Sequence, residues 1–342
     1  MLKTTFQKRL AILLAVFIAA LLALPLLIGD KPYVVNIFVL VFYMTTMSMA
    51  WNLLGGMTGQ NSIGHACFMG IGAYTCALIV NNTGMNPWVS MIFSILVTGI
   101  VAGLVFSQCF ILRGPYFTLV TIAFAECVRQ IILNWDFAGK AIGIQMPRLA
   151  QGWASFRFTS KVPYYYVAFI ILVGVYLLMK WIDNSKLGFA LKTIREDEDV
   201  AAAIGIKPLK YKVIAVVISA MVAGLCGFFY ANYYRYIDPD IMLQSQSVEF
   251  VLPAIIGGSA FVEGPLVGGI ILIPLSEWLR NQFGGILPGI NLILYAITLI
   301  LVIRFRPTGI LGWYNHSKLK NWLVYKVLGK EREEDEGGVK AV

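Results

Sequence analysis

A glycine-rich stretch that begins at Gly55 (GGMTGQNSIGHACFMGIG) places polar side chains at the edge of an apolar segment. The polar residues are Gln60, Asn61, Ser62 and His65. Lipid would reject such a face, and a backbone broken by glycine at membrane depth is tolerated where it is buried in protein or lines a water-filled cavity. We therefore expect these four residues to line a translocation pathway. Tight helix packing, with His65 hydrogen-bonded to a neighbouring helix, is the alternative.

Ser62 and His65 stand three residues apart and are the one pair that could act as a nucleophile and its base. No third group that would orient the histidine is evident, so an intramembrane enzyme is the less favoured hypothesis. The chain contains no G-x-x-x-x-G-K-[ST] phosphate-binding loop, and we expect it to be no enzyme and to hydrolyse no ATP itself. The cysteines show no CxxC or Cys/His metal spacing, so we expect packing residues, with no metal and no cofactor in this chain. They are Cys67, Cys76, Cys109, Cys127 and Cys226.

Glu126 and Arg129 are two charged residues within one apolar run. Because they stand three apart, they share a helix face and can neutralise each other, and that face must point away from lipid. A structural ion pair near the membrane edge is the expected role. A proton or solute relay is the alternative.

The stretch from Asn184 to Lys212 (NSKLGFALKTIREDEDVAAAIGIKPLKYK) is polar but has a helical pattern of its own. The acidic residues Asp197–Asp199 precede a short helical run over 200–204, where they suit the positive end of the helix dipole. Gly205 then supplies a helix stop, and Pro208 prevents continuation. We expect a short amphipathic helix lying along one membrane face. A merely solvated charged surface is the alternative.

The elements that must position these residues are membrane spans. Of 342 residues, 58% are hydrophobic and 13% charged, with a mean hydropathy of +0.75, which is more apolar surface than one water-soluble core could hide. The sequence predicts an all-α, polytopic transmembrane helical bundle of about ten spans (eight to ten), with broken or re-entrant glycine-rich segments. The segment 248–262 is short, and it either spans the membrane or re-enters. The candidate spans are 10–28, 33–54, 62–80, 88–112, 115–133, 163–182, 213–232, 248–262, 265–282 and 286–304.

Short basic segments predict the orientation of these spans, because Lys and Arg accumulate in cytoplasmic loops. They place both termini and the 183–212 loop in the cytoplasm, although the segment 134–162, assigned to the outside, carries four basic residues. The net charge of +9 reflects this orientation, and no nucleic-acid partner is expected. We thus expect a cytoplasmic N-terminus (1–9), a membrane domain (10–312) that includes the 183–212 loop, and a charged cytoplasmic tail (313–342).

A second glycine-rich stretch, IGGSAFVEGPLVGG, contains Gly264 and Gly268 in a G-x-x-x-G spacing that allows close helix contact. Together with Gly257 and Gly258, these residues are candidates for helix or subunit packing.

Three stretches together resemble the branched-chain amino acid permease family of ATP-binding cassette (ABC) importers, LivM-like in particular. They are NLLGGMTGQNSIGHACFMGIGAYTCAL, REDEDVAAAIGIKPLKYKVIAVVISAMVAGLCGFFYA and IGGSAFVEGPLVGG. The second resembles the EAA loop of importer permeases, E-A-A-three residues-G, at whose positions stand Asp199, Val200, Ala201 and Gly205. The first two of these depart from the usual Glu and Ala. The resemblance covers most of residues 45 to 310.

The resemblance implies a permease in the bacterial cell inner membrane that translocates small amino-acid-like solutes, with branched-chain amino acids as the expected substrate and urea, amides and other small solutes left open. Its implied partners are a second homologous permease subunit, two cytoplasmic ATPase subunits, a periplasmic substrate-binding protein and the lipid bilayer. It also implies that the loop carries the helix that couples to an ATPase. The residues of this coupling helix would be Arg195, Glu196, Asp197, Glu198, Asp199, Ala201, Gly205 and Ile206.

A self-contained secondary transporter is the rival hypothesis. It would need an ion or proton site near the membrane midplane, to which Glu126, Arg129 and His65 could contribute, and it would leave the patterned cytoplasmic loop without a role. An ATPase subunit that copurifies favours the importer, whereas transport by the chain alone favours the secondary transporter.

Overall fold

The structure is a computed structural model of a helical membrane protein. It describes residues 21–25, 31–110, 112, 114–283, 293, 296, 297, 300, 301, 304 and 308–316. The predictions for 1–9, for most of the spans at 10–28 and 286–304, and for most of the tail at 313–342 lie outside the described residues. So does the predicted cytoplasmic position of both termini.

Six described helices are long and apolar enough to cross a membrane, which confirms a multi-pass helical protein. They coincide with six of the ten predicted spans, because each predicted apolar run is close to the 20 residues that a bilayer requires. Prolines at the first turn start most of them, where the missing N–H costs no hydrogen bond. The helices are α2 (Pro32–Thr58), α3 (His65–Thr83), α4 (Pro87–Cys109), α5 (Pro115–Asn134), α6 (Val162–Asp183) and α9 (Pro208–Tyr234).

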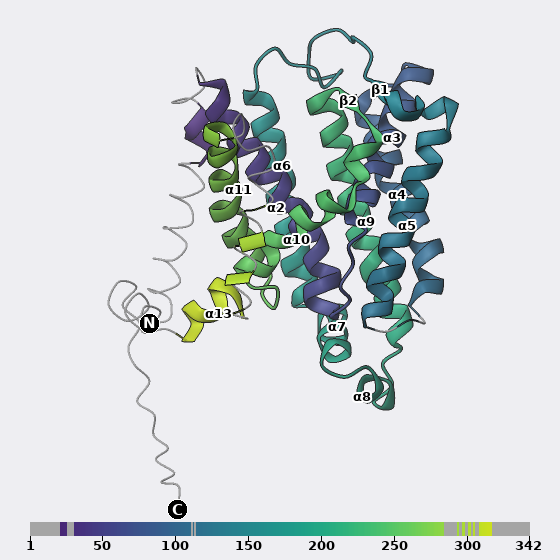
Figure 1. Ribbon diagram of the computed structural model, residues 1–342, viewed down its shortest axis with the longest axis vertical. Helices are drawn as coiled ribbons and strands as arrows, with labels where there is room; N and C mark the ends of the chain where they lie inside the picture. Colours follow the sequence, from purple (N-terminus) through teal and green to yellow (C-terminus); the bar gives the residue numbers. More distant parts are fainter. Residues whose placement is uncertain are drawn as a thin grey trace, which may run out of the picture.

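Helix α9 is the centre of the bundle. It packs against α3 and α4 on one side and α2 on another, while α6 packs on α2 (Figure 1). Small residues make the closest approach possible: a Cβ on Gly224 would lie 2.7 Å from the Ser94 carbonyl oxygen, and one on Gly227 would lie 2.2 Å from that of Met69.

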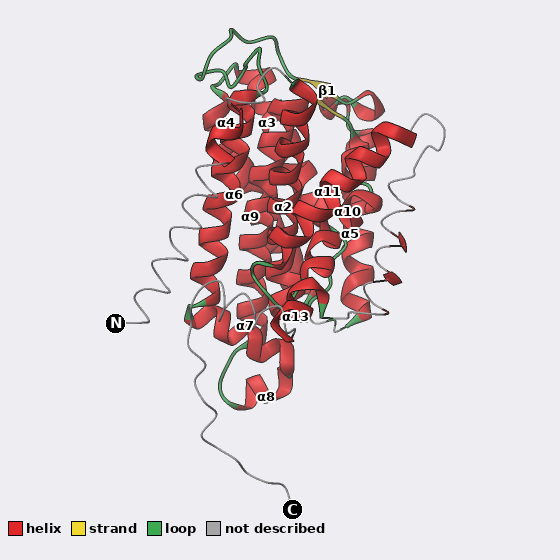
Figure 2. Ribbon diagram, turned by 90° about the vertical axis from the view of Figure 1, so that its left-hand side faces the viewer, coloured by secondary structure: helices red, strands yellow, loops and turns green. Residues whose placement is uncertain are grey.

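The two loop regions that the sequence assigns to opposite membrane faces lie at opposite ends of the bundle (Figures 1 and 2). One end carries the short helices η1 (Asp136–Ala138) and η2 (Lys140–Ile142) and a two-residue antiparallel pairing of β1 (Ile144–Gln145) with β2 (Tyr236–Ile237). The other end carries α7 (Lys186–Glu196) and α8 (Glu198–Ala203). The strand pairing and an isolated antiparallel bridge between Gly152 and Arg157 depart from an all-α fold.

The segment 248–262, for which the sequence allowed two outcomes, is a short helix followed by a turn. After η3 (Pro239–Met242), helix α10 (Gln244–Gly257) has 14 residues, or about 21 Å at 1.5 Å per residue. That is shorter than the hydrocarbon core of about 30 Å, so α10 cannot cross alone. The chain then turns into α11 (Gly264–Phe283), which packs against α10 and α2, and α13 (Gly309–His316) packs against both α10 and α11.

The second glycine-rich stretch packs helices within the chain. A Cβ on Gly257 would lie 1.7 Å from the Gly264 carbonyl oxygen, and one on Gly268 would lie 1.9 Å from that of Pro253. Gly258 has φ +114 and a Cβ there would lie 2.9 Å from the Thr308 carbonyl oxygen. These glycines lie where α10, α11 and the segment leading into α13 approach one another most closely, and a role in subunit packing stays a prediction.

We expect Gly257→Ala to lower the free energy of unfolding by about 1–3 kcal/mol, because the added methyl group must displace backbone. Gly174→Ala is the matched control, since a Cβ at this helical glycine would meet nothing within 4 Å. Thermal unfolding in detergent, followed by size-exclusion chromatography, measures both variants. If Gly257→Ala and Gly174→Ala lowered the free energy of unfolding equally, the packing role of Gly257 would be contradicted.

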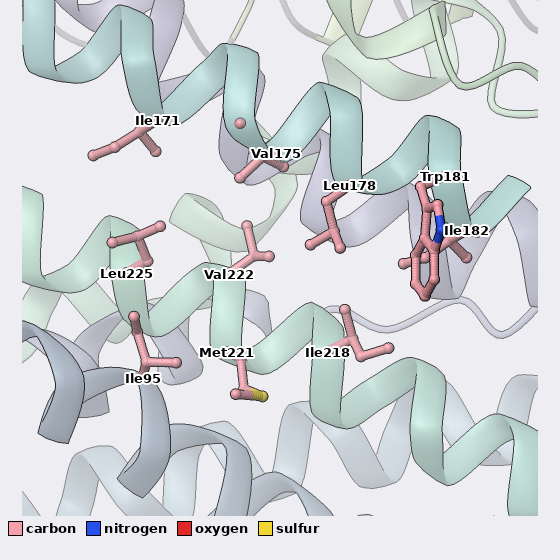
Figure 3. A pocket seen from close by; sticks show the side chains of 11 residues that line it. Ile95, Ile171, Val175, Leu178, Trp181, Ile182, Ile218, Met221, Val222 and Leu225 are labelled. Atoms are coloured by element: carbon pink, nitrogen blue, oxygen red, sulfur yellow. The ribbon is translucent and has the colours of Figure 1, made fainter.

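An apolar groove of about 450 Å³ lies between α4, α6 and α9. Figure 3 shows side chains of all three helices, including Ile95, Val175 and Met221, pointing into it, with Trp181 near one end. Its lining offers no charged or hydroxyl group to replace the water around a polar solute. This groove is therefore not the polar pathway that the sequence predicts.

Candidate functional site

The backbone is broken between α2 and α3, as the glycine-rich stretch predicts. Gly59 ends α2 with φ +71, a conformation that favours glycine, and residues 59–64 are not helical. Side chains from neighbouring helices satisfy the freed backbone groups: Trp51 Nε1 donates to the Ser62 carbonyl oxygen at 2.7 Å, and Thr118 Oγ1 donates to that of Asn61 at 2.7 Å. Side chains and the α2 backbone together satisfy polar groups of the break, since the Gln60 N–H donates to the Leu54 carbonyl oxygen at 3.2 Å.

His65, at the start of α3, is fully buried and hydrogen-bonds α9. Its Nε2 lies 2.8 Å from Ser219 Oγ, and Ser219 Oγ donates to the Ala50 carbonyl oxygen at 2.5 Å. Because the Ser219 hydroxyl already donates its proton to the Ala50 carbonyl oxygen, Ser219 Oγ can only accept from His65. The ring proton of His65 therefore lies on Nε2. Within the described chain, the buried Nδ1 has no partner. His65 thus joins α3 to α9 and α2, as the helix-packing alternative expected.

The four candidate pathway residues are not equally accessible. Ser62 and His65 are buried inside the chain, Gln60 is partly buried, and Asn61 is exposed. Ser62 Oγ accepts from the Gly64 N–H at 3.3 Å, and His65 bonds Ser219 instead. Ser62 and His65 therefore form no nucleophile–base pair. A role in the pathway stays a prediction, and the more accessible Asn61 and Gln60 are best placed for it.

The cytoplasmic-loop prediction needs a correction, because the segment from Arg195 to Ile206 is two helices and not one. Asp197 interrupts it with an extended backbone: it ends α7 and caps α8, accepting from the N–H groups of Asp199 at 2.8 Å and Val200 at 3.0 Å. Arg195 and Glu196 consequently belong to α7. Gly205, with φ +90, supplies the predicted stop.

Helix α8 lies outside the bundle, beyond the ends of α6 and α9 (Figures 1 and 2), and it carries exposed apolar side chains. Val200 is 55% exposed and Ile204, just after the helix, is 67% exposed, and the exposed Ala203 lies between them at helical spacing. Ala201 is fully buried. It therefore cannot permit close approach of another subunit in this conformation, which corrects the role expected of it.

A buried ion pair fastens α8 to the bundle. Lys212, in the second turn of α9, has a side chain that is 0% exposed, and its Nζ lies 2.7 Å from Glu198 Oε2. A charge buried to this degree requires a partner, because the desolvation cost of an isolated ammonium group is several kcal/mol. Analysis of the sequence missed Lys212. The sequence feature that could have identified Lys212 is a lysine within the first turns of an apolar helix, four residues after Pro208.

A second contact ties the segment that carries α7 and α8 to the broken segment between α2 and α3. Arg195 Nη1 donates to the Gly56 carbonyl oxygen at 3.0 Å, and the Arg195 side chain packs over Gly59. On α9, Lys212 and Ser219 are seven residues apart and so lie on one helix face. Helices α7 and α8 are thus linked by Arg195 to the end of α2, and by Lys212 through α9 to His65.

Comparison with protein families gives a match over most of the chain. The family described as "Branched-chain amino acid transport system / permease component" matches residues 33–303. No solved structure matches significantly.

Individual relatives carry related descriptions. The high-affinity branched-chain amino acid transport system permease protein LivM of Escherichia coli (strain K12) is 25% identical over 313 residues, covering 84% of this chain and 72% of LivM. BraD of Pseudomonas aeruginosa, described in the same words, is 29% identical over 188 residues, covering 53% of this chain and 59% of BraD. LivH of Salmonella typhimurium, also so described, is 22% identical over 289 residues, covering 78% of this chain and 90% of LivH.

Proposed function

The chain belongs to the family of permease components of branched-chain amino acid transport systems, and we propose that it translocates branched-chain amino acids across the bacterial inner membrane as one of two related permeases of an ABC importer. Permeases of this family are transport subunits. Two ATPase subunits supply the energy, and a periplasmic binding protein delivers the solute. The end of the bundle that carries α7 and α8 faces the cytoplasm.

The surface of α8 is the observation that carries this proposal. Val200, Ala203 and Ile204 present apolar side chains outside the bundle, at an end where the 183–212 loop is rich in Lys and Arg and is therefore cytoplasmic. Exposed apolar side chains grouped on one short helix are typical of a protein interface. Asp197 and Asp199 are exposed beside them and form a charged rim. An ATPase groove is the partner surface that such a helix fits.

The fastening of α8 explains how a movement at this surface would reach the membrane. Closure of the ATPases on ATP would displace α8, and the Lys212–Glu198 pair would pass that displacement to α9. Arg195 would pass it to the end of α2 through the Gly56 carbonyl. Both helices meet at His65, beside the broken segment 59–64. A rigid helix pair that moves against a broken element is a common basis of two-state switching.

Copurification after mild detergent extraction tests the proposed assembly. We expect the full-length chain to bring down a second permease and two ATPase subunits in stoichiometric amounts. A secondary transporter would instead purify without ATPase subunits and still carry solute in vesicles, which would overturn the proposal.

A further inference from the structure

A charged cluster lies on the exposed face of α5, near the middle of a helix long and apolar enough to span the membrane. Arg129 Nη1 lies 3.2 Å from Glu126 Oε1, and Arg129 Nη2 lies 2.9 Å from Asp240 Oδ1. Glu126 precedes the end of α5 by eight residues, about 12 Å along the helix axis at 1.5 Å per residue. The predicted ion pair between Glu126 and Arg129 is present, but it lies near the middle of α5 and not near the membrane edge, and η3 adds a second carboxylate to it.

The parts of this cluster differ in accessibility. The Arg129 side chain is only 17% exposed, whereas those of Glu126 and Asp240 are 50% and 65% exposed. Arg129 is thus the least exposed member of the cluster, and it pairs with two carboxylates that are themselves accessible. Two carboxylates and one guanidinium leave one net negative charge.

The hydrogen bonds of the cluster fall on one oxygen of each carboxylate. Glu126 Oε1 accepts from both Arg129 and Gln130, the latter at 2.6 Å, and Asp240 Oδ1 accepts from Arg129. Among the residues that the structure describes, none donates a hydrogen bond to the other oxygen of either carboxylate, which therefore has acceptor capacity for a cationic donor. Exposed charges inside a membrane span ordinarily face a protein cavity or a water-filled path, because lipid cannot solvate them.

We propose that Glu126 and Asp240 line the solute pathway in its outer half and bind the ammonium group of the passing solute, with Arg129 as the positioning residue. This proposal rests on the proposed function and narrows it. Urea and simple amides carry no ammonium group, so a site with net negative charge selects amino acids over them.

Accessibility to a water-soluble thiol reagent gives the first test. Glu126→Cys, in a chain whose Cys127 is replaced by serine, should react with a membrane-impermeant, charged thiol reagent added from the outside of proteoliposomes that hold the complete transporter. Native Cys127 is the matched control: it is exposed but lies about 100° further round the helix, and we expect it to stay unmodified. Equal reaction at both positions, or none at Glu126→Cys, would overturn the placement.

Transport gives the second test. We expect Glu126→Gln combined with Asp240→Asn, which keeps shape and removes charge, to lower leucine uptake at saturating loaded binding protein at least tenfold. Glu277→Gln is the control, since Glu277 also pairs with an arginine three residues on, at 2.7 Å, and it should transport within twofold of wild type.

The outcomes separate the two proposals. If wild type takes up leucine on ATP and the double variant does so within twofold, the ammonium site is wrong while the importer stands. If wild type itself shows no ATP-dependent uptake, the proposed function fails. Copurification of the ATPase subunits with the double variant shows that the complex is intact, so a loss of uptake cannot be assigned to misfolding.

Discussion

Replacing Ile204 with aspartate should remove the ATPase subunits from the purified complex. Ile204 is 67% exposed beside α8, and a carboxylate there would have to be desolvated without a partner in an apolar groove. We expect at least a hundredfold less ATPase per permease after mild detergent extraction, while the second permease remains bound. Quantitative mass spectrometry of the copurified subunits measures this ratio.

The matched control for Ile204→Asp is Ile142→Asp. Ile142 is 81% exposed, but it lies in η2 at the opposite end of the bundle, so the same substitution should leave the ATPase content unchanged. If Ile204→Asp retains the ATPases, or Ile142→Asp loses them equally, α8 is not the docking helix. Ala201 is unsuitable for this purpose, because it is buried and its replacement would test folding.

Replacing Glu198 with methionine should both destabilise the chain and uncouple ATP hydrolysis from uptake. Lys212 would then be a buried ammonium without its carboxylate partner, which costs about 3–5 kcal/mol. The double variant Glu198→Met with Lys212→Met removes both charges and should recover most of that stability, because apolar replacement of a buried pair is often neutral. The thermal unfolding midpoint and ATP-driven uptake in proteoliposomes measure the two effects.

Lys210→Met is the control for this pair. Lys210 is exposed two residues earlier on the same helix, and such surface substitutions usually change stability by less than about 0.5 kcal/mol. Equal unfolding midpoints for Glu198→Met and for the double variant would show that the buried charge is not what destabilises the chain. Normal uptake by Glu198→Met would show that the pair does not transmit the movement of α8.

The bundle could be predicted from the sequence because each span is a long apolar run, and the bilayer fixes how long such a run must be. The break between α2 and α3 was also predictable, since Gly59 and the polar residues after it interrupt an apolar segment. The same holds for the end of α8 near Gly205, where glycine and then proline stop a helix. These features depend on residues close together in the sequence.

The contacts that complete the candidate site depend on distant residues and could not be predicted in this way. His65 and Ser219 are 154 positions apart, and Arg129 and Asp240 are 111 apart. No periodicity in either segment specifies its partner. The two-residue pairing of β1 with β2 is likewise too short to leave an alternating pattern.

The rotation of α8 about its own axis could not be predicted for a different reason. Its last four residues are valine and three alanines, so hydrophobic periodicity does not distinguish the face that packs on α9 from the face that points outward. The fold decides this: the Lys212–Glu198 pair fixes the rotation of α8, and that rotation buries Ala201 and exposes Val200 and Ile204.

Uptake by reconstituted proteoliposomes tests the central claim most directly. The vesicles would hold this chain with its second permease, with or without the two ATPase subunits, and radiolabelled leucine would be supplied on the binding protein. We predict uptake that requires both the ATPase subunits and hydrolysable ATP, and that stops when Ile204 is replaced with aspartate. Leucine accumulation in vesicles that lack the ATPase subunits, driven by an ion gradient alone, would contradict an ABC importer.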